Sequence, residues 1–124
     1  MRILEIREKT IPVGGTMRNA AIGFDEMTAS VVAVLTDAVS GGVPIIGYGL
    51  DSIGRYGHGG LLRERFIPRL MAAGEAEICE PETGNIDPMR AWPVMMKNEK
   101  QGGHGERSAA VGVLDAALWD AAAK

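Results

Sequence analysis

The sequence has a single cysteine, Cys79, so it can form neither an internal disulfide nor a metal site built from several thiolates. Aromatic residues are scarce, at 5% of the chain. No apolar run approaches the roughly 20 residues that a transmembrane helix needs. Charged residues soon after Met1 leave no room for the apolar segment of a signal peptide. We therefore expect a cytoplasmic protein.

Positive charge is too sparse for a nucleic-acid-binding surface. Thirteen Lys and Arg residues against 16 Asp and Glu residues give a formal net charge of −3, and the basic residues do not cluster. Glycine, in contrast, is abundant: the 17 glycines are about twice the usual share of roughly 7%, and they gather near position 14, in 41–60 and in 102–105. The 124 residues suffice for one domain with a modest core.

The first half of the chain has the pattern of three β-strands. Residues 2–8 alternate apolar and charged side chains, as a half-buried strand does. Residues 28–39 are rich in β-branched side chains, and Gly41-Gly42 supplies a turn before a third strand at 45–50. Glycine and proline after the first strand predict a loop to about residue 27. These features predict an antiparallel three-stranded meander.

The second half changes to helical spacing. Apolar residues in 61–73 recur every three or four positions, with Gly74 as a stop and Pro68 as a kink or break. Asp87-Pro88 is a good N-cap and first residue for a helix to about 97, although Pro93 lies inside it.

A final helix is predicted from about Glu106 or Ser108 to the last residue. Its apolar residues form the stripe of a core-facing helix: Ala110, Val113, Leu114, Ala117, Leu118 and Ala121. Val111, Trp119 and Ala122 add a second strip, which a three-stranded sheet on the first side cannot cover. Either dimerisation or disorder explains why this strip is apolar, or the chain is separate from the rest of a larger protein that would cover it. We predict an α+β fold in a single domain, 1–124, with the meander in 1–50 followed by a small helical bundle in 58–124.

The C-terminal motif "VLDAALWDAAAK" (113–124) resembles the segment that leads into the barrel of enzymes in the mandelate racemase and muconate-lactonizing branch of the enolase superfamily. Val113 departs from the pattern, where a small residue is usual. Within the family, the motifs "GYGLDSIGRYGHGG", "RERF", "NEKQGGHGERS" and "ALWDA" look most like the D-tartrate dehydratase type. The resemblance covers the whole chain and implies the family's N-terminal capping domain, without its barrel.

The resemblance also implies a function. Enzymes of this family hold Mg²⁺ on three barrel carboxylates, and a lysine or histidine removes the proton next to the substrate carboxylate. All of these groups would lie beyond Lys124, so we expect no catalytic residue, no metal ligand and no bound cofactor in this chain. The capping domain would contribute substrate contacts and closure to a dehydratase that acts on a tartrate-like hydroxy acid, and we expect a homo-oligomer. The alternatives are a racemase or epimerase of the same superfamily, or a stand-alone oligomerising or binding module without chemistry.

Five residues are candidates for substrate contact. Lys100 stands where the D-tartrate dehydratase type has a substrate-binding lysine, although a solvated surface lysine is the alternative. Arg55 can bind a carboxylate through two hydrogen bonds or pair with a nearby Asp. The remaining candidates, Asp51, Arg18 and Asn19, lie in the two loops that the resemblance assigns to closure. Ile53 replaces a substrate-binding asparagine, which favours a hydroxy acid with a less polar distal end.

Three other features give weaker indications of a functional site. His58 and His104 have mirrored surroundings, but no third ligand is spaced to complete a metal site with them. The glycines of 102–105 could cradle an anion, yet no nucleotide-binding motif is present. Cys79 has no histidine near it in sequence and is expected to be an ordinary packed or surface thiol.

Overall fold

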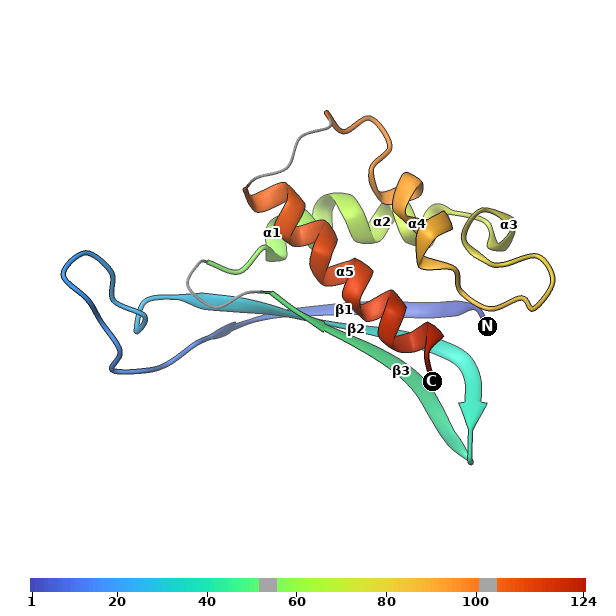
Figure 1. Cartoon of the computed structure of the whole chain (residues 1–124), viewed down its shortest axis with the longest axis horizontal. Coiled ribbons are helices and arrows are strands. Elements are labelled where there is room, and N and C mark those ends of the chain that lie inside the picture. Colours follow the sequence, from blue (N-terminus) through green and yellow to red (C-terminus); the bar gives the residue numbers. More distant parts are fainter. Residues whose placement is uncertain (52–55, 101–104) are drawn as a thin grey trace.

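A three-stranded antiparallel sheet carries a layer of helices on one face (Figure 1). The computed structural model describes residues 1–51, 56–100 and 105–124. The strands are β1 (Ile3–Pro12), β2 (Thr28–Ser40) and β3 (Val43–Leu50), in the order β1-β2-β3. Gly41 and Gly42 connect β2 to β3 with φ values of 58° and 82°, the left-handed pair that a two-residue hairpin turn requires. The α+β fold class and the predicted meander are confirmed.

The first strand is longer than its sequence pattern predicts. We expected it at 2–8, but β1 continues to Pro12 because β2 offers it pairing partners as far as Thr28. Pro12 is tolerated there because it is the last residue of an edge strand. The loop that follows therefore spans only 13–27.

The predicted helix at 61–73 is present in three consecutive pieces: α1 (Gly59–Leu61), the π-helical turn η1 (Leu62–Phe66) and α2 (Ile67–Ala72). The widened turn lies directly before Pro68, which has no N–H and whose ring would clash with the carbonyl four residues earlier. The predicted break at this proline therefore takes the form of a π turn.

Two short helices complete this region. The preceding helix stops before Gly74, as predicted, but Gly74 is not left-handed. Its backbone is extended, and its N–H donates to Glu77 Oε1 at 2.9 Å at the start of α3 (Glu75–Ile78). Asp87 caps α4 (Pro88–Met95) as predicted, with Oδ1 accepting from the N–H of Met89 at 2.9 Å. This helix ends two residues earlier than expected.

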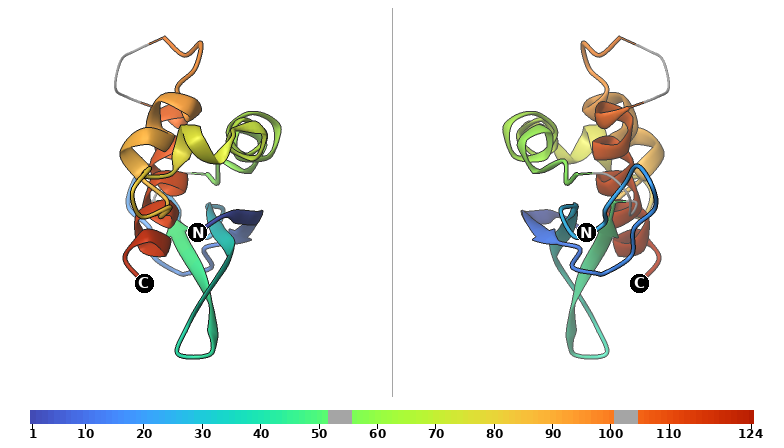
Figure 2. Two further views of the ribbon diagram at one scale, coloured as in Figure 1. Left: turned by 90° about the vertical axis from the view of Figure 1, so that its right-hand side faces the viewer. Right: turned by 90° about the vertical axis from the view of Figure 1, so that its left-hand side faces the viewer.

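The last helix, α5 (Glu106–Ala122), lies along β3 (Figure 2). All six residues of its predicted core stripe are buried. The contact with the sheet is close, because a Cβ atom at Gly47 or Gly49 would meet the Ala117 or Val113 carbonyl oxygen at 2.1 or 2.0 Å. Glycine at these two positions therefore allows the helix to approach the strand.

The second apolar strip of α5 is divided between interior and surface. Val111 is fully buried, since α5 also packs against α4, η1 and α1. The expectation that this side needs a cover from outside the chain is thus wrong for Val111. Trp119 remains half exposed. Within the described ranges, no helix combines the length and apolar character that crossing a membrane requires.

Candidate functional site

The base of the loop 13–27, the segment after β3 and the start of α5 lie towards one end of the sheet, which we call the loop end, while the rest of that loop projects away from the helices (Figure 1). The strands are antiparallel, so the loop 13–27 between β1 and β2 starts and finishes beside the end of β3 at Leu50. The helix α5 runs antiparallel to β3, because Gly49 lies against Val113 and Gly47 against Ala121. Its first residue, Glu106, therefore also lies at the loop end.

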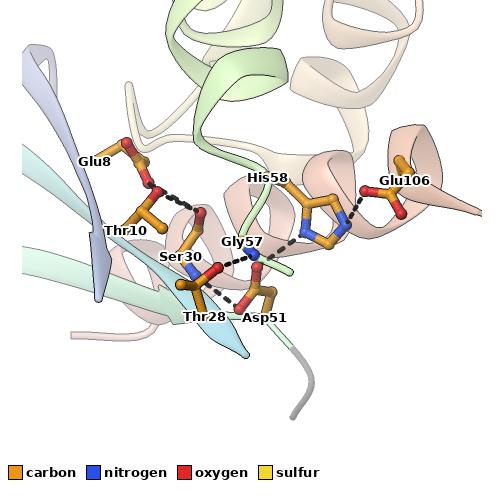
Figure 3. A network of polar contacts seen from close by, with 8 residues as sticks. All are labelled: Glu8, Thr10, Thr28, Ser30, Asp51, Gly57, His58 and Glu106. Atoms are coloured by element: carbon orange, nitrogen blue, oxygen red, sulfur yellow. Dashed lines mark hydrogen bonds and ion pairs between the residues drawn. The ribbon is translucent and has the colours of Figure 1, made fainter. Parts of the chain in front are cut away.

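A buried carboxylate–histidine pair lies at the centre of the loop end (Figure 3). Asp51 directly follows β3, and its Oδ2 lies 2.9 Å from His58 Nδ1, with both side chains 2% exposed or less. The other Asp51 oxygen accepts from the N–H of Ser30 at 2.8 Å. The carboxylate thus joins the end of β3 to β2 and sets the plane of the imidazole.

The second nitrogen of His58 faces Glu106 in the first turn of α5. His58 Nε2 lies 3.2 Å from Glu106 Oε2, while the Glu106 side chain is 65% exposed. The atoms are close, but the direction does not meet hydrogen-bond geometry, and Nε2 is buried without a hydrogen-bond partner among the described residues. A neutral ring that donates from Nδ1 to Asp51 would direct the Nε2 lone pair towards a carboxylate. The arrangement therefore favours positive charge between Nε2 and Glu106, carried either by a proton on the ring or by a bound cation.

A second carboxylate network lies beside this pair and fixes the middle of β1 (Figure 3). Glu8 Oε1 accepts from Thr10 Oγ1 at 2.7 Å and from Ser30 Oγ at 2.9 Å. Its other oxygen pairs with Arg63 in η1, and the Glu8 side chain is fully covered. Ser30 thus connects the two networks, since its backbone N–H serves Asp51 and its hydroxyl serves Glu8. Each buried acceptor has a partner, as a stable interior requires.

The predicted substrate-contact residues at the loop end have different surroundings. The Asp51 carboxylate is directed inward and is engaged by Ser30 and His58, so it orders the end of β3. Asn19 lies in a small hairpin within 13–27, where its Oδ1 accepts from the N–H groups of Ala21 and Ile22 at 2.9 and 2.8 Å. Its side-chain NH₂ group remains available to donate.

Arg18 pairs with Gly23 across the same hairpin and is exposed, as a residue that contacts a ligand would be. Arg55 lies outside the described residues, as do Ile53 and His104. The roles predicted for these residues therefore stay predictions.

Lys100 is exposed and follows a strongly anchored neighbour. The Glu99 side chain is only 7% exposed and lies among three arginines: Arg69 at 2.8 Å, Arg65 at 3.5 Å and Arg107 at 3.6 Å. The hydrogen bond from Arg69 is the largest of the effects that lower the pKa of Glu99. Arg107 belongs to α5, so this cluster holds the chain just before Lys100 close to the start of that helix.

Sequence reasoning missed both charge clusters. The pairs Asp51–His58 and His58–Glu106 have no characteristic spacing, and no local pattern marks Glu99 as the partner of distant arginines. The structure brings Asp51 and Glu106 to His58, whereas His104 lies outside the described residues.

Comparison with protein-family models finds none that matches this chain. In residues 1–51, 56–100 and 105–124, no three His, Cys, Asp or Glu side chains converge as ligands of one metal ion. These residues do not fit a Mg²⁺ site of three carboxylates, and we assign no step through Mg²⁺ to them.

Proposed function

We propose that this chain is the N-terminal capping domain of a Mg²⁺-dependent dehydratase of acid sugars, from the mandelate racemase and muconate-lactonizing branch of the enolase superfamily. In this role it closes over a barrel domain and contacts the distal part of a tartrate-like hydroxy acid. The Mg²⁺ ion and the acid and base that carry out the elimination would belong to the barrel.

The observation that carries the proposal is the gathering of the candidate segments at the loop end. The segment after β3 contacts both other segments there, although all three are far apart in sequence: Gly57 donates to Thr28 at the base of the loop 13–27, and His58 faces Glu106 at the start of α5. A domain that contributes specificity and closure needs its contact residues on one surface, so that they can exclude water together. The order of strands and helices is also the one that the resemblance implies.

Lys100 has the strongest case for substrate contact. Its ammonium group is exposed, whereas the preceding residue, Glu99, is fixed by three arginines. An anchored backbone lowers the conformational entropy that the lysine loses when it binds a carboxylate or hydroxyl. The Arg18 guanidinium, exposed in the loop 13–27, can bind a carboxylate through two hydrogen bonds.

A chimera tests this proposal. Residues 1–124 would replace the capping domain of an enolase-superfamily acid-sugar dehydratase, and turnover of tartrate and related acids would be measured with Mg²⁺. Loss of a charged hydrogen bond of about 1.5–3 kcal/mol predicts that Lys100→Ala lowers kcat/KM by roughly 10- to 100-fold. Lys97→Ala, which removes another exposed lysine of the same segment, is the matched control.

Two results would contradict the proposal. One is a folded chimera in which Lys100→Ala and Lys97→Ala have the same kinetics. The other is turnover of these acids by the isolated chain with Mg²⁺, because the chain would then contain the chemistry that we assign to the barrel.

One observation favours the second candidate function, a stand-alone oligomerising module. The sheet face opposite the helices carries half-buried Val31, Ala33 and Leu35, with Tyr48 and Leu50 more than half exposed. An apolar sheet face of this kind is typical of an interaction surface. In analytical ultracentrifugation, a stable, monodisperse oligomer that Leu50→Glu dissociates supports the module, while weak and polydisperse association supports the capping domain.

A further inference from the structure

The unpartnered nitrogen of His58 points to a ligand at the loop end. The imidazole is 1% exposed, its Nδ1 is held by Asp51, and its Nε2 faces Glu106 without a hydrogen bond in the described part of the chain. We propose that His58 Nε2 and Glu106 Oε2 bind a divalent transition-metal cation of the zinc class, with Asp51 as the outer partner of the imidazole. This inference does not depend on the proposed function.

The distance between the two ligand atoms fits a shared ion. Nε2 and Oε2 are 3.2 Å apart. A tetrahedral zinc ion with bonds of about 2.0–2.2 Å places neighbouring ligand atoms roughly 3.3–3.6 Å apart, close to the separation found here. In such a site the carboxylate oxygen lies to one side of the direction in which an N–H would point. The same offset explains why atoms this close do not form a hydrogen bond here.

The histidine is prepared for metal binding by its other contacts. Asp51 Oδ2 lies 2.9 Å from Nδ1, and the neutral tautomer that donates from Nδ1 to this carboxylate presents the Nε2 lone pair to a metal ion. The Asp51 carboxylate is itself fixed by the N–H of Ser30 at 2.8 Å. A carboxylate behind a metal-binding histidine is a common arrangement, because it fixes the ring and makes the ligand nitrogen more basic.

The ligand types select the class of ion. One imidazole and one carboxylate suit Zn²⁺, Ni²⁺ or Cu²⁺ better than Mg²⁺, which prefers oxygen ligands and retains its waters. No third protein ligand converges here among the described residues, so water would fill the remaining positions on the exposed side of Glu106. The bound ion would join the segment before α1 to the first turn of α5 and so hold the loop end together.

The test is a titration of the metal-free chain with Zn²⁺ and, separately, with Mg²⁺, followed by isothermal titration calorimetry and by the imidazole signals in NMR spectra. We expect one Zn²⁺ per chain, at least tenfold weaker binding of Mg²⁺, and a shift of the His58 signals. Glu106→Gln removes a ligand at an exposed position, and Asp51→Asn removes the outer partner. Each is expected to weaken Zn²⁺ binding by roughly 10- to 100-fold.

Two control variants remove the second histidine and the single cysteine of the chain. His104→Gln and Cys79→Ala are expected to bind Zn²⁺ with unchanged affinity. The proposal is overturned if no saturable binding occurs up to millimolar Zn²⁺, or if Glu106→Gln binds as tightly as the unmodified chain. It is equally overturned if a control variant loses the site, or if His58 Nε2 still carries a proton when Zn²⁺ is in excess.

Discussion

Replacing Gly49 with alanine tests how closely α5 packs on β3. The added Cβ would lie 2.0 Å from the Val113 carbonyl oxygen and 3.1 Å from the Ala117 nitrogen. Both neighbours are backbone atoms of a helix, so no side-chain rotation can remove the clash. An ordinary contact requires the helix to move away from the strand by about 1.4 Å.

That movement has a cost because the interface is fully packed. Leu114 and Leu118 of α5 have no exposed surface, and neither has Val32 of β2. Overpacking of a core of this kind costs about 1–3 kcal/mol, and a clash with backbone belongs at the upper end of that range. For a domain of this size, a loss of about 3 kcal/mol lowers Tm by roughly 10 °C.

Urea and thermal unfolding, followed by far-ultraviolet circular dichroism, measure this loss. Gly112→Ala is the matched control, because it adds the same methyl group to α5 where no atom lies within 4 Å. It should stabilise the protein by about 0.5–1 kcal/mol, since alanine is the better residue in a helix interior. If Gly49→Ala unfolds within about 0.5 kcal/mol of the unmodified chain, the close approach of α5 to β3 is refuted.

Three further predictions use the same unfolding assays. Phe66→Ala removes the largest fully buried side chain and should cost about 3–5 kcal/mol, so a change below 1 kcal/mol would show that η1 does not cover the core. Asp87→Ala removes the cap of α4 and should lower the free energy of unfolding by about 1 kcal/mol. Glu82→Ala, at an exposed position, is the control and should leave stability nearly unchanged. The hydrogen bond from Arg69 lowers the pKa of Glu99, so the stability that Glu99 contributes is present near neutral pH and lost as the pH falls below its usual pKa. Glu99→Gln should therefore be less stable than the unmodified chain at pH 7, with a difference that shrinks towards pH 3; a constant difference contradicts this.

The elements of the fold were predictable because each depends on a local pattern. Alternation predicted β1, the β-branched run predicted β2, and Gly41-Gly42 predicted the turn into β3. The cap at Asp87 was predictable for the same reason, since a side chain and an N–H two residues later form it. Interactions within a few residues need no knowledge of the rest of the chain.

The ends of these strands and helices, and the burial of their sides, were less predictable. The strand β1 extends to Pro12 because β2 pairs with it there, and that partner is distant in sequence. Val111 is buried because α4 and η1 form a layer over α5, whereas the sequence pattern indicated only that this side of the helix is apolar. Gly74 acts as the start of α3 since Glu77 reaches back to its N–H.

The candidate site was the least predictable part. Lys100 was identified through a resemblance, but its anchoring by Glu99 requires arginines from two separate segments, η1–α2 and α5. The pairing of His58 with Asp51 and Glu106 follows from the register of α5 on β3, which the glycines at 47 and 49 permit. The sequence by itself determined the order of strands and helices and the apolar stripe of α5, because periodicity is a local property. Only the tertiary structure decided which charged groups meet at the loop end, since packing at long sequence separation places them within contact distance.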